Sequence, residues 1–171
     1  MLYHNKKNMK KILFLAVIAV ALTSCFELKI PVAEVKGNVQ DYPYAYVVST
    51  SGVTSSSGVY GNEHGVYGGL TKTVNPSEVI SGYLMKKGYT ILPSISPELA
   101  DKTLIVTYGY TGRRRLSLFA YASCIIIQMR HATSQAMIVS CEAEAGGYDE
   151  NESVYIFQAI NNALNKIFST H

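Results

Sequence analysis

The sequence has no tryptophan, few charged residues and no apolar run long enough to span a bilayer. Charged side chains make up only 16% of the 171 residues. The longest apolar run covers residues 12–22, whereas a membrane-spanning helix needs about 20 residues. The sequence also has neither a glycine-rich phosphate loop nor a serine or cysteine nucleophile motif. These absences argue against a helical membrane protein, a nucleotide-binding enzyme and a hydrolase of the common nucleophile classes.

Metal-ligating and acid–base residues are also sparse. His64 follows Glu63, but no second His or Cys stands at ligand spacing, and His131 lies in a different predicted turn. Glu142 and Glu144 are typical of a solvated strand edge, because a hydrolytic pair needs one carboxylate in an apolar pocket. The sequence therefore predicts no metal, no catalytic residues and a protein that is not an enzyme.

The most informative segment that is present runs from Met9 to Cys25. A basic start, a short apolar middle and a small-residue end are typical of a removed export signal. Its end, Leu22-Thr23-Ser24-Cys25, resembles the lipobox of bacterial lipoproteins. The resemblance implies lipidation of the Cys25 thiol, with palmitate as the expected acyl chain, and cleavage after Ser24. We therefore expect a signal peptide at residues 1–24 and the lipid on Cys25 as the only covalent group. The lipid is expected to be a stable anchor, because two or three acyl chains attach a protein stably to a membrane, whereas a single chain binds reversibly.

The residue after Cys25 is Phe26 and not Asp. By resemblance to enterobacterial sorting, this favours the outer membrane over the inner one. We expect an outer-membrane lipoprotein, anchored by its lipid and facing the periplasm.

The charge balance changes once the signal is removed. Four of the 15 Lys and Arg residues lie within residues 1–24, and 12 Asp and Glu lie after them. The mature chain is therefore close to neutral, and the pI of 8.7 reflects the signal. This gives no reason to expect a nucleic-acid partner. The remaining length suits one domain.

Two regions lie between the anchor and the first predicted helix. Residues 25–41 are predicted to be a lipid-anchored tether, and residues 42–171 a single domain that begins with a strand at Tyr42–Thr50. Residues 51–72 repeat a short Gly-Val-Tyr-Gly motif around Tyr60 and Tyr67. This segment is either a disordered loop or a protruding hairpin. The hairpin is favoured because Val and Leu recur in it, and its two tyrosines are candidate partner contacts.

The rest of the chain alternates strands with two helices. Asn75, Pro76 and Glu78 form a helix start, and Gly88 ends that helix. Further elements are predicted at Tyr89–Leu92, Leu104–Tyr110, within Leu116–Met129, at Ala136–Ala145, and as a closing helix at Asn151–Phe168. The predicted fold is α+β and two-layered: a mostly antiparallel sheet of about five strands, two helices on one face, and the protruding Gly/Tyr hairpin.

A further resemblance rests on short motifs between Asn75 and Phe168. Lys87-Gly88-Tyr89, Ala100 to Tyr108, the hairpin at Ile125 to Val139 and the helix around Ala159 to Leu164 are similar to an uncharacterised family of small envelope lipoproteins. The resemblance implies the same fold and no catalytic residues. The chain differs from that family in the 51–72 excursion and in having no Trp in the last strand.

Arginine and tyrosine supply the remaining candidate contacts. Arg113, Arg114 and Arg115 follow the Leu104–Tyr110 strand and form either a solvated turn or a site for lipid phosphates. Tyr60, Tyr67, Tyr108 and Tyr110 are either packing residues or platforms for sugar rings.

Cys124 and Cys141 are left as a pair after lipidation of Cys25. If a four-residue loop joins their strands, the two cysteines lie opposite each other and can form a disulfide. An odd-length loop instead turns Ile125, Ile127 and Met129 inward and separates the cysteines.

Two functions therefore remain open. The first is a non-enzymatic lipoprotein that binds or scaffolds an unknown envelope component. The alternative is a lipoprotein that binds peptidoglycan or polysaccharide through Tyr-rich surfaces.

Overall fold

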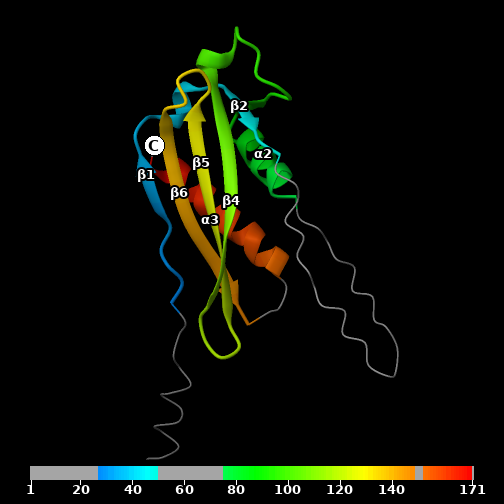
Figure 1. The fold of residues 1–171 in the computed structure, drawn as a ribbon, viewed down its shortest axis with the longest axis vertical. Coiled ribbons are helices and arrows are strands. Elements are labelled where there is room, and N and C mark those ends of the chain that lie inside the picture. Colours follow the sequence, from blue (N-terminus) through cyan, green and yellow to red (C-terminus); the bar gives the residue numbers. More distant parts are fainter. Residues whose placement is uncertain (1–26, 50–74, 149–151, 171) are drawn as a thin grey trace, which may run out of the picture.

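A mixed six-stranded sheet, covered on one face by two helices, forms the part of the chain that the computed structural model describes, residues 27–49, 75–148 and 152–170 (Figure 1). The strand order is β1-β6-β5-β4-β2-β3. In chain order the elements are β1 (Val32–Val35), a 3-10 turn (Val39–Asp41), β2 (Tyr44–Val47), α2 (Pro76–Lys86), β3 (Thr90–Ile91), a 3-10 turn (Ala100–Lys102), β4 (Thr103–Arg115), β5 (Tyr121–His131), β6 (Met137–Gly147) and α3 (Glu152–Ser169).

The sheet has an antiparallel half and a parallel half. β4, β5 and β6 form an antiparallel meander, and β1 pairs antiparallel with β6. β2 runs parallel to both β4 and β3, because α2 carries the chain back across the sheet between β2 and β3. The predicted α+β class is confirmed. The prediction of about five mostly antiparallel strands was only partly right.

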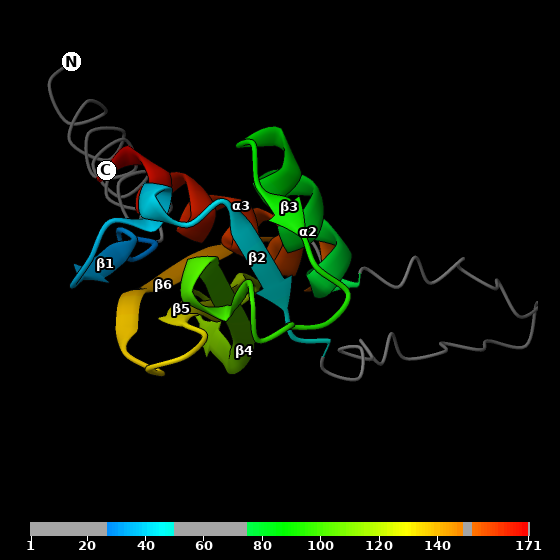
Figure 2. The ribbon, with the colours of Figure 1, turned by 90° about the horizontal axis from the view of Figure 1, so that it is seen from above.

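Both helices pack on the same face of the sheet, as the end-on view in Figure 2 shows. α3 contacts mainly β5 and β6, and α2 lies beside α3 next to β2 and β3. The helix stripe predicted near the C-terminus forms the centre of this layer. The buried side chains of α3 are Tyr155, Ile156, Ala159, Ile160, Ala163, Leu164 and Ile167.

The predicted boundary between a tether and a body at residue 42 is not seen. Val32–Val35 forms the edge strand β1, and Val39 is fully buried in the core. Pro31 and Gly37 bound this short strand, which is why its alternation looked too weak to predict pairing. The folded body therefore begins well before residue 42.

The three arginines are not in a turn. β4 continues through residues 111–115, and a β-bulge between Tyr110 and Gly112 shifts its pairing with β5. Gly112 has a φ of +125°, a conformation that favours glycine. The hairpin tip is therefore residues 116–120, at the far end of a ribbon that Figure 1 shows projecting beyond its neighbours.

The helix start at Asn75 is confirmed, because the Asn75 side chain accepts a hydrogen bond from the Ser77 amide at 3.1 Å. The predicted Gly/Tyr hairpin at residues 51–72 lies outside the described residues. Within the described ranges, no helix is long and apolar enough to cross a membrane.

Candidate functional site

An ion pair on the open face of the sheet fastens the N-terminal segment to the body. Arg114 on β4 reaches across β5 to Glu144 on β6, with Nη2 2.7 Å from Oε2 and Nε 3.1 Å from Oε1. The reach is possible because the intervening positions on β5 are the small residues Ala122 and Cys124. Two parallel N–H donors on one carboxylate give the strongest geometry that such a pair can have.

Glu144 is almost completely buried, with 3% of its surface exposed. Its hydrogen bonds from Arg114, followed by that from the Lys29 amide, hold the pKa of the carboxyl below its ordinary value despite burial, which acts in the opposite direction. The interpretation of Glu144 as a solvated strand residue was therefore wrong. Glu142, two residues earlier on the same face, is exposed as predicted.

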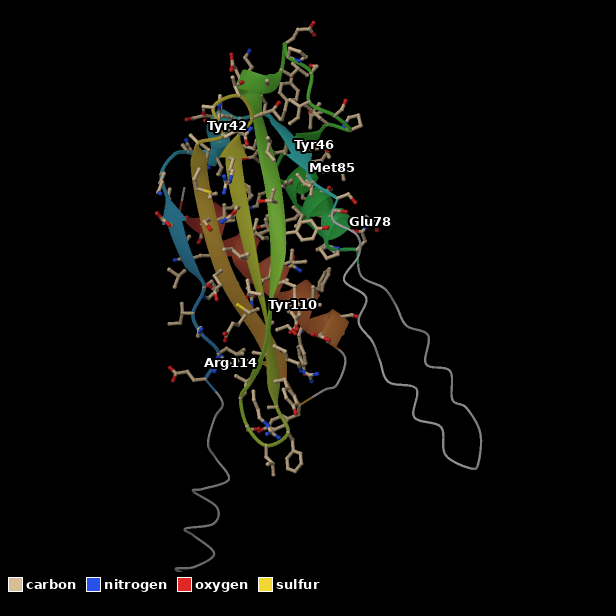
Figure 3. All side chains as sticks on the ribbon, in the orientation of Figure 1. Tyr42, Tyr46, Glu78, Met85, Tyr110 and Arg114 are labelled. Atoms are coloured by element: carbon tan, nitrogen blue, oxygen red, sulfur yellow. The ribbon has the colours of Figure 1, made fainter. Side chains whose placement is uncertain are left out.

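The same pair holds the chain that emerges from the lipidation position. Arg114 Nη2 donates to the carbonyl oxygen of Glu27 at 3.2 Å, and the Lys29 amide donates to Glu144 Oε2 at 3.2 Å. The Lys29 ammonium also lies 3.7 Å from Glu144 Oε1. Residues 27–29 are thus fixed beside Arg114, whose position next to the N-terminal strand is visible in Figure 3. We name this arrangement the anchor clamp: Glu27, Lys29, Arg114 and Glu144.

The other two arginines lie on the opposite side of the ribbon from Arg114, because side chains alternate along a strand. The guanidinium of Arg113 lies 3.8 Å from the ring centre of Tyr121, and that of Arg115 lies 6.0 Å from it. Arg115 also donates to the carbonyl oxygen of Leu118 at 3.2 Å. The sequence cluster therefore divides into one clamp residue and two exposed cations beside the hairpin tip.

A cleft lies at the other end of the sheet. It has a volume of about 390 Å³ and is lined by Gln40, Tyr42, Pro43, Lys87, Gly88, Tyr89 and Phe168. The Lys87 ammonium lies 5.5 Å from the ring centre of Phe168, within cation–π range. The partly exposed rings of Tyr42 and Phe168, together with one ammonium and one amide, can contact the C–H face and the polar groups of a sugar.

The cleft wall is held by a buried tyrosine hydroxyl. Tyr89 donates to the carbonyl oxygen of Val39 at 2.7 Å, and burial followed by the charge of Asp41 raises the pKa of Tyr89 to about 12. Tyr42 packs its ring edge against His131 with centroids 5.6 Å apart. These contacts join the first 3-10 turn to the segment that follows α2 and to the end of β5.

The sheet tyrosines proposed for sugar stacking are not available for it. Tyr108 is buried in the core, with 9% of its surface exposed. Tyr110 donates to a Glu152 carboxylate oxygen, and burial, followed by that bond, raises the pKa of Tyr110 to about 12. Both rings face the helix layer, so this part of the sugar hypothesis was wrong.

The disulfide between Cys124 and Cys141 does not form. Five residues separate β5 from β6, so the odd-loop alternative holds, and Cys124 pairs with Glu144 while Cys141 pairs with Ile127. The thiols therefore lie on opposite faces of the sheet, both free and buried. Burial raises the pKa of Cys124 and raises that of Cys141 to about 11, so neither thiol is activated.

No group of three His, Cys, Asp or Glu side chains that could hold a metal ion occurs among the described residues. His131 instead packs on Tyr42 and accepts a hydrogen bond from the Ser134 amide at Nδ1, 3.0 Å away. Four predicted site residues lie outside the described residues: Tyr60 and Tyr67 as contacts, His64 as a candidate ligand and Cys25 as the lipidation residue.

Sequence reasoning missed three features of these two ends. Glu144 is predicted to be solvated but is buried, the prediction of a strand within Leu116–Met129 does not separate Leu118 and Phe119 from that strand, and the cleft is not predicted. The cleft joins residues from about 40 to 168, so no local pattern marks it. The only signal for the hairpin tip was Leu-Ser-Leu-Phe directly after three arginines.

Comparison with known proteins supports the lipid anchor and the fold separately. The family profile described as a prokaryotic membrane lipoprotein lipid attachment site matches residues 9–25. This match supports a bacterial lipoprotein attached to a membrane by lipid. A search of curated proteins found no match.

Among solved structures, the chain is similar to PelC from Paraburkholderia phytofirmans, a dodecamer. The similarity has a TM-score of 0.53 at 10% identity and covers 80% of this chain and 96% of that one. A single-substitution variant of the same PelC dodecamer gives a TM-score of 0.50 at 11% identity, covering 80% of this chain and 95% of that one. At this identity the similarity shows a shared fold.

Proposed function

We propose that this chain is an outer-membrane lipoprotein, anchored through acylated Cys25 at the periplasmic face, that binds or scaffolds another envelope component without catalysis. The observation that carries the proposal is the lipid attachment match at residues 9–25, followed directly by a segment clamped to the fold. A flexible tether would let the domain turn freely. A clamped segment instead fixes which end of the sheet faces the membrane.

The test follows the anchor in cells. Metabolic labelling with a palmitate analogue is expected to mark the native protein and to leave Cys25→Ser unmarked. The native protein is expected in the outer-membrane fraction of a density gradient, and Cys25→Ser outside it. A Cys124→Ser variant serves as the matched control, because it removes a different thiol and is expected to keep both the label and the fraction. Equal labelling of the native protein and Cys25→Ser would refute the proposal.

The periplasmic face needs its own measurement. Protease added to intact cells is expected to leave the protein whole, and the same protease added after permeabilising the outer membrane is expected to digest it. Digestion in intact cells would place the protein on the cell surface instead.

A second candidate function is glycan binding, with the distal cleft in place of the sheet tyrosines. Tyr42 and Phe168 supply partly exposed rings, and Lys87 supplies an ammonium suited to a carboxylate-bearing sugar. Detergent-solubilised protein is expected to sediment with peptidoglycan sacculi or to bind an acidic polysaccharide, and Lys87→Gln is expected to weaken that binding. Lys102→Gln is the control, since Lys102 is an exposed lysine outside the cleft. Equal recovery of all three proteins in the supernatant would remove this candidate.

The proposal extends to the assembly state of the protein and to a second copy of the chain as a partner. The structural relatives are dodecamers, and the edge strand β1 exposes the apolar residues Val32 and Val35. We include self-association through β1 in the proposal, because an exposed apolar edge strand readily pairs with another chain. Light scattering of the solubilised protein, with Val32→Lys as the disrupting variant, tests it. The resemblance to an uncharacterised family of envelope lipoproteins stays a prediction.

A further inference from the structure

We propose that the tip of the β4–β5 hairpin, residues 116–120, is a second membrane contact, which enters the interfacial region of the phospholipid leaflet that carries the lipid on Cys25. This inference rests on the proposed lipid anchor. It adds a protein surface to that anchor and gives the domain a defined orientation on the membrane.

The tip exposes two large apolar side chains. Leu118 and Phe119 have 68% and 71% of their surfaces exposed. The Ser117 hydroxyl accepts hydrogen bonds from the amides of Phe119 at 3.4 Å and Ala120 at 3.2 Å. The turn is therefore held in a shape that presents both side chains outward. Transfer of exposed apolar side chains from water to the boundary between headgroups and acyl chains lowers the free energy.

The lipid emerges at the same end of the molecule. Glu27 is held by Arg114, which lies on β4 only two residues before Leu116 opens the tip. Cys25 is two residues before Glu27, and two residues of fully extended chain span at most about 7 Å. The acyl chains are therefore attached close to the base of the hairpin, and Figure 3 shows Arg114 near the end of the sheet where the ribbon projects.

The cations beside the tip match a phospholipid surface. Arg113 and Arg115 are exposed, and neither forms an ion pair with a described residue. Of the nearby described acids, Glu144 is already paired with Arg114 and Glu152 accepts the Tyr110 hydroxyl. Glu27 is an exposed acid that contacts Arg114 through its backbone carbonyl oxygen. Asp149 and Glu150 lie outside the described residues. An Arg guanidinium binds phosphate with two parallel hydrogen bonds, and Tyr121 between the two arginines has the amphipathic ring that suits an interface.

This docking sets the height of the cleft above the membrane. β4 runs from Thr103, which pairs with Tyr44 two residues from Tyr42 in the cleft wall, to Arg115 beside the tip. Its 13 residues span roughly 40 Å at the usual rise per residue. With the tip in the headgroups, the cleft therefore faces away from the membrane.

The absence of tryptophan makes a direct test possible. Full-length lipidated Phe119→Trp and, separately, Leu118→Trp are reconstituted in vesicles of phosphatidylethanolamine with a minority of phosphatidylglycerol. Each has a single tryptophan, so its emission reports one position. We expect a blue-shifted emission that is quenched by lipids brominated near the top of the acyl chain. Met85→Trp is the matched control at an exposed position on α2, and we expect no blue shift and no quenching there.

The arginines are tested in the Phe119→Trp background. Arg113→Gln with Arg115→Gln is expected to reduce both the blue shift and the quenching, and to abolish their dependence on phosphatidylglycerol. Lys86→Gln with Lys102→Gln removes the same charge far from the tip and is expected to change neither.

Two results would overturn the inference. One is a tryptophan at position 118 or 119 that stays solvent-exposed while the protein is bound to vesicles. The other is a blue shift without bromolipid quenching, which would assign the tip to a second copy or another protein. The proposed lipid anchor is tested separately, by palmitate labelling and by fractionation of Cys25→Ser. The anchor proposal and the hairpin-tip proposal can therefore fail independently.

Discussion

The two ends of the sheet are built from different kinds of side chain. At the anchor end, a bidentate ion pair and a close backbone approach join segments that lie far apart in the sequence. At the distal end, aromatic rings and one lysine surround an open cleft. Charge pairs and close packing fix a chain in one position, whereas the partly exposed rings of Tyr42 and Phe168 leave contact area unused. This difference agrees with the proposed function, in which the clamp end serves attachment and the cleft end serves binding.

The largest expected effect is at the anchor end, at Gly146. A Cβ added there would lie 2.1 Å from the Tyr121 carbonyl oxygen and 2.6 Å from Ala122 Cα, both backbone atoms that cannot turn aside. We expect Gly146→Ala to lower the free energy of unfolding by about 3 kcal/mol, the upper range for overpacking. Urea denaturation of the solubilised protein measures it.

Gly82→Ala is the control for that prediction. Gly82 is inside α2, and no atom beyond its chain neighbours and the nearby backbone of that helix lies within 4 Å of the added Cβ. This substitution is expected to raise stability by about 0.5–1 kcal/mol because alanine favours a helix over glycine. If Gly146→Ala is as stable as the native protein or more stable, the strand contact at Gly146 is not tight.

A smaller loss is expected when the charge of the anchor clamp is removed. Glu144→Gln weakens both hydrogen bonds from Arg114 and is expected to cost about 1.5 kcal/mol, a discounted value because Arg114 is partly open to solvent. Glu142→Gln, at an exposed position on the same strand, is expected to change nothing measurable. Denaturation curves of the two variants give the difference, and equal midpoints would show that the clamp does not stabilise the fold.

The same carboxylate predicts a pH dependence. The pKa of Glu144 is lower in the folded protein than in the unfolded chain. In the unfolded chain, the pKa of a Glu is about 4.3. The contribution of the Glu144 carboxylate to the free energy of unfolding is therefore fully present above that value, and it is lost as the pH falls through the pKa of the folded state. The stability gap between the native protein and Glu144→Gln is expected to be constant near neutral pH and to close in acid. A gap that widens in acid would contradict this assignment.

The smallest effect is expected at the distal end. Tyr89→Phe removes the hydrogen bond to the Val39 carbonyl oxygen and is expected to cost about 1 kcal/mol. Tyr46→Phe is the control, because Tyr46 lies on the uncovered side of the sheet and has no hydrogen bond with a described residue. Thermal unfolding distinguishes the two variants. If they are equally stable, the cleft wall does not depend on this hydroxyl.

Local patterns predicted the helices well. The Asn75 cap and the apolar stripe of α3 are set by residues three or four positions apart, so both could be found in the sequence. The alternation of side chains along β5 and β6 limits the register of the two strands to two alternatives. One of these places Ile125, Ile127 and Met129 inward, and the structure has that register.

Long-range features could not be found in this way. The pairing of β1 with β6 joins residues more than 100 positions apart. Pro31, directly before β1, also weakens the alternating pattern from which a strand is predicted. The burial of Glu144 depends on Arg114 and on Lys29, which come from two different parts of the chain. The arginine run looked like one cluster, but the extension of β4 through it sends adjacent side chains to opposite faces.

The clamp on residues 27–29 also determines how the protein bears mechanical load. With the proposed lipid on Cys25, tension from the membrane would enter the fold first at Glu27 and then along β1, which is paired lengthwise with β6. Pulling parallel to a paired strand strains its ladder bonds in shear, all together, whereas pulling across it unzips them one at a time. A lipoprotein attached in this way can transmit force from the bilayer to the central strands.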